Sequence, residues 1–373
     1  MAGRREIAFV CVLVLLMIRG AAAMPVDIVF CMDLSGSTNG LLDNLKTKFW
    51  DVSNEISMYS PPAQLRVGVV AYSRPKYGKE NYYIKIISDL TGDLDRVENE
   101  LLSIKTITEQ GKQYVGPALL KCVEELSWSK DKNALKVIFI VGNGLVNLGG
   151  NEYMTACEKA VAKKIIVNSV FCKTYVNMEE IMQWKKIADL GRGTYYEIDI
   201  NRKPVLIPSD FDNAGLENLN TALNNTYLYY GPEGKSRGAL QVELDNKMKE
   251  MHFLYFLSRA TAKASANYQG KNKAWDLVDL SNETRINFSN IDRNLLPDSL
   301  HAASDDDLKK AVDMKWSERR KIIESMKIIG LKRIQAVKEK KAEIGVSESN
   351  TFTGMVIECM EKLAKGPGVK TGN

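Results

Sequence analysis

One stretch near the start of the chain reads Val26-Asp27-Ile28-Val29-Phe30-Cys31-Met32-Asp33-Leu34-Ser35-Gly36-Ser37. It is an apolar run that ends in one carboxylate and two hydroxyls, and a helical pattern follows almost directly, so it predicts a short buried strand that turns into a helix. Because alternate residues can point to one side, Asp33, Ser35 and Ser37 are placed to face a single point. Ligands of open α/β sheets bind at the carboxyl ends of the strands, and hard oxygen ligands suit Mg²⁺, Mn²⁺ or Ca²⁺.

Strand and helix patterns alternate after this stretch. Continuous apolar runs predict further buried strands at 65–72, 82–87, 136–141, 165–171 and 194–198. Helical spacing of apolar residues predicts helices at 41–58, 93–105, 114–128, 153–163 and 178–190. Continuous rather than alternating apolar strands indicate a mostly parallel sheet that is covered on both faces. The short link between the second and third strands predicts an antiparallel pair at the edge. The predicted fold class is therefore α/β, with a doubly wound, Rossmann-like, mostly parallel six-stranded sheet, one antiparallel edge strand and a mainly α-helical C-terminal region.

The segment Asp33-Leu34-Ser35-Gly36-Ser37 resembles the Asp-x-Ser-x-Ser signature of the von Willebrand factor type A (VWA) domain. The order of predicted elements over about residues 24–200 agrees with that family. The resemblance implies a metal-ion-dependent adhesion site that holds a divalent cation, Mg²⁺ in the first place and Mn²⁺ or Ca²⁺ as alternatives.

Two further loops complete the metal site in that family, one with a threonine before the third helix and one with an aspartate after the fourth strand. The matching stretches here are Gly111–Leu119 and Gly142-Asn143-Gly144, which put Gln113 and Asn143 at those positions. The metal ligands that the resemblance implies are Asp33, Ser35, Ser37, Gln113 and Asn143.

The replacements at Gln113 and Asn143 keep a side-chain oxygen but lose the second carboxylate. A cation would then be held less tightly, with Asp33 as its single anionic ligand, unless Thr108 and Glu109 compensate. The alternative interpretation has no metal: Asp33, Ser35 and Ser37 cap the first helix and close the turn by hydrogen bonding.

The first residues have the pattern of a secretory signal peptide. Arg4 and Arg5 precede an apolar segment at 7–18, which is shorter than the roughly 20 residues of a membrane span, and Ala21-Ala22-Ala23 follows. We therefore expect an exported protein, periplasmic or secreted. The predicted parts are a signal peptide at 1–23, a VWA-like domain at 24–203, a mixed helical and loop accessory region at 204–300, a helical C-terminal region at 301–365 and a disordered tail at 366–373.

The C-terminal region has two predicted helices of note. One covers 241–266, and a longer one begins after Ser304, where three carboxylates favour the positive end of the helix dipole. The long helix has an apolar side and a basic side. The basic side carries Arg319, Arg320, Lys321, Lys327, Lys332, Lys338, Lys340 and Lys341. A solvated helix face is the favoured interpretation, and contact with an anionic membrane surface or an acidic partner is the other.

Several classes of function are disfavoured. A formal net charge of +5 on 373 residues gives no case for nucleic acid. The chain has two histidines, His252 and His301, which argues against a zinc site of His/Cys type and against a histidine-dependent triad in the first half of the chain. The segment Gly234-Lys235-Ser236 resembles the end of a phosphate loop, but Tyr229 stands where the first glycine of that loop would be. We therefore expect no nucleotide site. The cysteines beyond the signal peptide are expected to be mostly small buried side chains. They are Cys31, Cys122, Cys157, Cys172 and Cys359.

These observations predict an exported, non-enzymatic protein-binding module. A divalent cation at the Asp-x-Ser-x-Ser site would bind an acidic group of a partner protein. The first alternative is a metal-independent scaffold with a degenerate site. The least favoured alternative is a metal-assisted hydrolase, for which Glu109 or Glu152 would have to serve as general base.

Overall fold

The computed structural model describes residues 23–60, 63–109, 111–173, 177–199, 205–208, 213–346, 351–364 and 370–371. Apart from residue 23, the predicted signal peptide lies outside the described residues, as does most of the predicted C-terminal tail. Residues 370 and 371 of that tail form β8 (Lys370–Thr371), which pairs antiparallel with β2 (Tyr59–Ser60).

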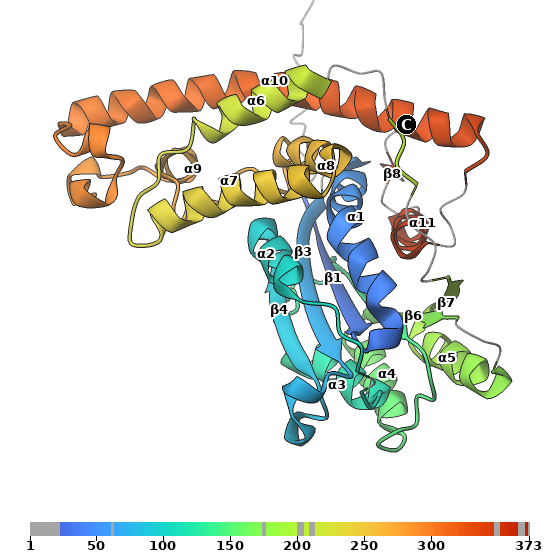
Figure 1. The fold of residues 1–373 in the computed structure, drawn as a ribbon. Helices are drawn as coiled ribbons and strands as arrows, with labels where there is room; N and C mark the ends of the chain where they lie inside the picture. Colours follow the sequence, from blue (N-terminus) through green and yellow to red (C-terminus); the bar gives the residue numbers. More distant parts are fainter. Residues whose placement is uncertain are drawn as a thin grey trace, which may run out of the picture.

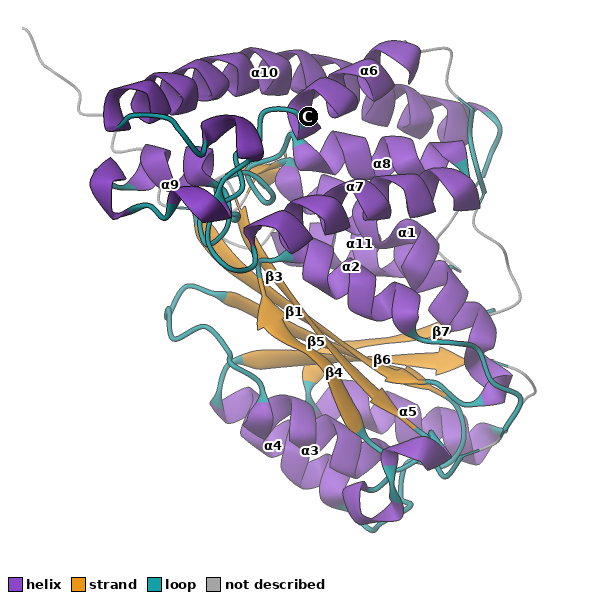
Figure 2. Ribbon diagram, turned by 60° about the vertical axis from the view of Figure 1, so that its left-hand side comes forward, coloured by secondary structure: helices purple, strands orange, loops and turns teal. Residues whose placement is uncertain are grey.

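Six strands of the described chain form one sheet, in the spatial order β4-β3-β1-β5-β6-β7. Neighbouring strands are parallel except β3 and β4, which are antiparallel. The predicted fold class is therefore confirmed, including the antiparallel strand at the edge (Figure 2). The strands are β1 (Met24–Asp33), β3 (Ala63–Tyr72), β4 (Lys85–Thr91), β5 (Leu135–Gly142), β6 (Ile165–Cys172) and β7 (Arg192–Ile198).

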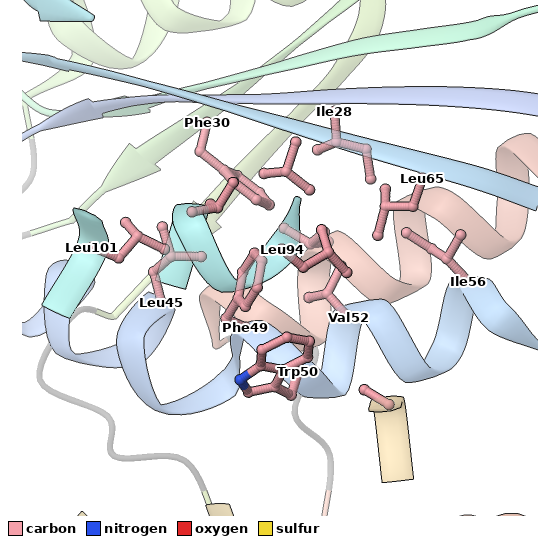
Figure 3. Close-up of a cluster of buried hydrophobic side chains, with 14 of the residues drawn as sticks. Ile28, Phe30, Leu45, Phe49, Trp50, Val52, Ile56, Leu65, Leu94 and Leu101 are labelled. Atoms are coloured by element: carbon pink, nitrogen blue, oxygen red, sulfur yellow. The ribbon is translucent and has the colours of Figure 1, made fainter. Parts of the chain in front are cut away.

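Helices cover both faces of this sheet, which explains why the strands are apolar without alternation. Ile28 and Phe30 of β1 point into one core, whereas Val29 and Cys31 point into the other. Figure 3 shows Phe30 directed toward the helices that cover the first face. That face is covered by α1 (Asn39–Ser57), α2 (Leu94–Ser103) and α11 (Phe352–Ala364), and the other by α3 (Val115–Glu125), α4 (Glu152–Ala162) and α5 (Met178–Leu190).

The predicted strand at 82–87 is wrong at its start. Tyr82 and Tyr83 have φ values of 52° and 58°, in the left-handed region, so the chain is still turning at these residues. The strand β4 begins only at Lys85.

The described residues from 213 to 346 form a helical region that packs on the α1 and α2 side (Figure 1). Its helices are α6 (Asn213–Asn224), α7 (Gly234–Met251), α8 (Phe253–Lys263), α9 (Leu277–Glu283) and α10 (Asp305–Glu343).

Short 3-10 helices occur in both parts of the described chain. Those of the sheet domain are Gly36–Thr38, Pro75–Tyr77 and Lys79–Asn81, and those of the helical region are Phe288–Asn290, Arg293–Leu295 and Asp298–Leu300. None of the described helices is long and apolar enough to span a bilayer.

The single helix predicted at 241–266 is wrong, because the chain breaks at His252. His252 is extended, with φ −172° and ψ 136°, and its Nδ1 accepts a hydrogen bond from the Leu254 backbone N–H at 3.1 Å. The imidazole thus caps a new helix, α8, and α7 and α8 pack against each other.

The helix α10 begins where the sequence predicts, since Ser304 Oγ accepts the Asp307 backbone N–H at 3.1 Å. The prediction that Arg319 belongs to the exposed basic face of α10 is wrong. Arg319 is fully buried, and its Nη1 donates to Asp276 Oδ2 at 2.6 Å and to Asp279 Oδ1 at 2.8 Å. The approach of two carboxylates from the α9 end explains why this cation is inside.

A second buried ionic network joins the helical region to the sheet domain. Arg259 of α8 donates through Nη1 to Asp95 and Glu98 of α2, both at 2.7 Å, and through Nε to Asp245 of α7 at 2.7 Å. Lys263, one turn on, donates to Asp245 at 2.9 Å. The five described cysteines are all buried, as expected, and they are free thiols.

Candidate functional site

Three loops bring Asp33, Gln113 and Asn143 together at the carboxyl edge of the sheet. Asp33 is the last residue of β1, and Asn143 directly follows β5, the strand beside it. Gln113 comes from the loop before α3. Its Nε2 donates to Asp33 Oδ2 at 3.0 Å and to Asn143 Oδ1 at 2.6 Å. The structure thus brings together three of the five residues that the resemblance implied, and their role as metal ligands stays a prediction.

The two serines of the signature lie beside this group. The Ser35 backbone N–H donates to Asp33 Oδ1 at 2.9 Å, which closes the turn after β1. Ser35 is buried and Ser37 is exposed, and their Oγ atoms lie 3.1 Å apart. Neither Ser35 nor Thr38 caps a helix with its side chain. The metal-free interpretation predicted that these residues close the turn and cap the first helix. The structure shows the turn closure but no capping hydrogen bond from the Ser35 side chain.

Burial is the largest influence on the pKa of Asp33. The carboxylate is fully buried, which raises its pKa, and the hydrogen bonds from Ser35 and Gln113 partly offset that rise. Within the described residues, no group of three or more His, Cys, Asp or Glu side chains is placed to hold a metal ion. Asp33 is thus a buried carboxyl group that accepts hydrogen bonds from the Ser35 backbone N–H and from the Gln113 side-chain amide.

The arrangement of the Gln113 amide does not fit a bound divalent cation. Its N–H₂ group takes the lone pairs of Asp33 and Asn143 that a cation would need. Its Oε1 lies on the side of Gly144, where a Cβ would be 2.0 Å away. In this arrangement the amide itself bridges the two acceptors.

Glycines allow the three loops to approach one another. A Cβ at Gly142 would lie 2.3 Å from the Tyr72 hydroxyl and 3.0 Å from Asp33 Cβ. A Cβ at Gly111 would lie 1.6 Å from the Ser73 carbonyl oxygen. Larger residues at these positions would push the loops apart, so the site depends on both glycines.

The sequence missed several supporting residues. From α5, Glu180 Oε2 accepts the Gly144 N–H at 3.1 Å and Trp184 Nε1 donates to the Gly144 carbonyl at 2.9 Å. Arg74 is buried and donates through Nε to the Leu34 carbonyl at 3.1 Å, and burial lowers its pKa. The position of Arg74, two residues after the end of an apolar strand, could have indicated that it lies at the carboxyl edge of the sheet. No feature of the sequence around Glu180 indicates that it contacts the site.

Residues at 108 and 109 do not supply the compensating ligands considered above. The Glu109 backbone carbonyl accepts the Gly36 N–H at 2.9 Å, and the residue itself is exposed. The Thr108 backbone packs against Gly36, where a Cβ would lie 2.8 Å from its carbonyl. This loop therefore supports the turn through its backbone.

Apolar and aromatic side chains of neighbouring loops form a rim beside the site. Tyr114 follows Gln113, and its ring lies 5.4 Å from that of Tyr82 and 6.1 Å from that of Tyr83. Tyr82 is 49% exposed, and Leu145 and Leu148, in the loop after Asn143, are each 39% exposed. Exposed aromatic and aliphatic groups around a polar centre are typical of a protein-binding surface.

Neither a protein-family model nor a curated protein sequence matches this chain. Among solved structures, the neighbours are VWA-domain proteins over about half of the chain.

Proximal thread matrix protein 1 of the mussel byssus is 14% identical, with a TM-score of 0.37, over 48% of this chain and 43% of its own. The SpRpn10 VWA domain is 12% identical, with a TM-score of 0.35, over 49% of this chain and 91% of its own. The manganese-loaded TRAP protein of Plasmodium vivax is 15% identical, with a TM-score of 0.33, over 48% of this chain and 69% of its own. This chain thus spans less than half of the mussel protein, and the likeness concerns the fold alone.

Proposed function

We propose that this chain is an exported, non-enzymatic protein-binding module whose binding face is the carboxyl edge of the sheet. The convergence of Asp33, Gln113 and Asn143 beside a rim of exposed apolar groups carries this proposal. Tyr82 is the anchor that a partner would bury, since tyrosine is enriched among the residues that dominate binding free energy, and Leu145 and Leu148 would add apolar contact area beside it.

The binding that we propose needs no cation. The Gln113 amide holds the loops of Asp33 and Asn143 together by hydrogen bonds, so the face is organised before a partner arrives. Preorganisation reduces the entropy that is lost on binding. This is the metal-independent alternative of the sequence analysis, with a binding role for the scaffold.

The metal-dependent form stays a second candidate, favoured by the hard oxygens of Asp33, Ser35 and Ser37. It requires the Gln113 amide to turn so that Oε1 rather than Nε2 faces Asp33. The residues that would then hold Mg²⁺, Mn²⁺ or Ca²⁺ are Asp33, Ser35, Ser37, Gln113 and Asn143. For the hydrolase interpretation, which needs Glu109 or Glu152 as general base, the hydrogen bond described between Glu109 and the site is that of its backbone carbonyl with the Gly36 N–H.

A capture experiment tests the binding face. The chain is immobilised beside the variants Tyr82→Glu and Leu148→Glu and exposed to extract from the source cells, with chelator present. A partner retained by the wild-type chain should be lost from both variants. Met182→Glu is the matched control, because Met182 is 66% exposed on α5 and belongs to no part of the rim. A partner that binds all four chains equally refutes the proposed face.

Titration calorimetry separates the two forms. Mg²⁺, Mn²⁺ and Ca²⁺ are titrated into the chelator-stripped chain and into Asp33→Ala. Saturable heat that the variant loses supports the metal-dependent form, and absence of heat at millimolar cation supports the metal-independent one. Fractionation of source cells tests export, since a chain that stays in the cytoplasmic fraction contradicts that part of the proposal.

A further inference from the structure

The helical region carries a large groove that the sheet-edge site does not use. Its volume is about 1060 Å³, and it lies between α10 and the segment that runs from the end of α8 to α9. One wall includes Trp316, Ile323 and Ile328 of α10, and the other includes Ala264 and Asn282.

The groove is remote from the carboxyl edge of the sheet. The C-terminal end of α1 contacts the helical region, where Asn54 Nδ2 donates to the Ser258 carbonyl at 3.0 Å. The site at Asp33 precedes the N-terminal end of the same helix, which has 19 residues and is therefore roughly 28 Å long. Figure 1 shows α10 along the side of the molecule where α8 lies. A ligand in the groove thus makes no contact with Asp33 or Gln113.

The charge of the groove is positive. Arg320, Lys321 and Lys327 line it and are exposed, and Lys332 lies one turn beyond. No ion pair within the part of the chain that the structure describes involves these four cations. Of the two carboxylates in the lining, Asp279 is already bonded to the buried Arg319 at 2.8 Å, so that Glu324 alone offsets the exposed cations.

An apolar stripe lies between these cations. Ile323 and Ala264 are buried in the groove, and Ile328 is 51% exposed at its edge. Leu331, three residues further on and therefore on the same side of the helix, is 55% exposed. Leaving these aliphatic groups in water is unfavourable, by about 25 cal/mol for each Å² of apolar surface.

We propose that this groove binds an acidic amphipathic segment of a partner protein, in helical conformation. Apolar side chains at helical spacing would cover Ile328 and Leu331, and flanking Asp or Glu side chains would pair with Arg320, Lys321 and Lys327. From Trp316 to Ile328 the helix α10 rises by about 18 Å, which matches some three turns of a bound helix. The hollow shape favours a peptide over a membrane, because a flat bilayer surface would not enter the groove between α10 and the segment after α8.

Display of random peptides tests the proposal with the full chain. Peptides of about 15 residues, long enough for four helical turns, are selected on the wild-type protein. The enriched sequences should be acidic, with apolar residues repeated at spacings of three and four. Their affinity is then measured by fluorescence anisotropy against the groove variant Lys327→Glu/Ile328→Glu, for which we expect binding weaker by about tenfold or more.

The matched control is Met182→Glu/Lys186→Glu, which makes the same kind of change on the exposed face of α5. It should bind the peptides as the wild type does, and both variants should keep the thermal transition of the wild type. Peptides without acidic excess, or with equal affinity for the groove variant, overturn the proposal. Binding to phosphatidylserine vesicles that the groove variant loses, with no peptide enriched, also overturns it and identifies a membrane-binding surface instead.

Discussion

Gln113 Nε2 lies 3.0 Å from Asp33 Oδ2 and 2.6 Å from Asn143 Oδ1, so one neutral amide bridges two acceptors at the end of β1 and β5. A cation and an amide N–H₂ compete for the same lone pairs. We therefore expect the side chains at 113 and 143 to control how well this edge of the sheet binds a cation.

We predict that Gln113→Thr/Asn143→Asp converts the site into a cation site. The change removes the bridging amide and adds a second carboxylate, which hard divalent cations prefer. Mg²⁺ at a hundredfold excess over its dissociation constant should stabilise the double variant by about 2.7 kcal/mol. Thermal denaturation with Mg²⁺ and with chelator measures the difference. The triple variant with Asp33→Ala should lose the effect, and equal stabilisation of the wild type by Mg²⁺ would contradict the prediction.

The loop geometry leads to a second prediction, for Gly111→Ala. The added Cβ would lie 1.6 Å from the Ser73 carbonyl oxygen, so the backbone of one loop has to move. We expect a loss of about 1–3 kcal/mol in the free energy of unfolding, measured with urea. Gly92→Ala is the control, because the nearest atom to its Cβ would be 3.6 Å away. Equal effects at the two positions would show that the close approach is not what constrains Gly111.

The sequence predicted the architecture because the strands are covered on both faces. Continuous apolar runs such as 28–32 are typical of strands that are buried on both faces, and their alternation with helices along the chain indicates the fold class. It could not predict the backbone turns at Tyr82 and His252, which depend on left-handed or extended conformations that carry no periodic signal. For the site, the resemblance that begins at Asp33, Ser35 and Ser37 indicated which loops contribute. It could not indicate the orientation of the Gln113 amide, which depends on neighbours that are remote in sequence.

Arg319 illustrates the same limit and leads to a third prediction. Helical spacing put it on the basic face of α10, but carboxylates of Asp276 and Asp279 meet it inside the protein. Arg319→Met leaves these two anions buried without their cation, and we expect a loss of about 3–5 kcal/mol in chemical denaturation. Arg320→Met, at the exposed neighbouring position, should change stability by less than about 0.5 kcal/mol. Similar losses from both substitutions would contradict the ionic explanation.

The network around Arg259 predicts a pH dependence of stability. Burial raises the pKa of Glu98 to about 7, even though Arg259 and the Trp50 N–H act in the opposite direction. The folded state therefore holds this proton more tightly than the unfolded state, whose Glu pKa is about 4.3. The stabilisation is complete below the unfolded value and is lost as pH rises through about 7.

Urea denaturation between pH 4.5 and 8 measures this contribution against Glu98→Gln, which cannot titrate. The free energy of unfolding of the wild type, relative to the variant, should fall as pH rises across this range. Trp50→Phe removes a hydrogen bond that lowers the pKa of Glu98, so it should move the decline to higher pH. A relative stability that rises with pH would mean that the Arg259 ion pair outweighs burial.

The last prediction concerns α11, which returns from the end of the chain to the sheet. The Phe352 ring packs edge-on against Phe30 of β1, with centroids 5.6 Å apart, and both side chains are buried. The helix thus completes one of the two cores of the sheet, although more than 150 residues separate it from β7. Phe352→Ala should cost about 3–5 kcal/mol, and the sheet and the helical region should unfold in one transition.

Circular dichroism and tryptophan fluorescence, followed through the same urea titration, test that prediction. Met178→Ala is the control, because Met178 is 62% exposed on α5 and should contribute less than about 0.5 kcal/mol. A chain that ends at residue 203 should lose the cooperative transition of the full chain, since the core that contains Phe30 is left open. If that shortened chain unfolds with the midpoint of the full protein, α11 covers the sheet without stabilising it.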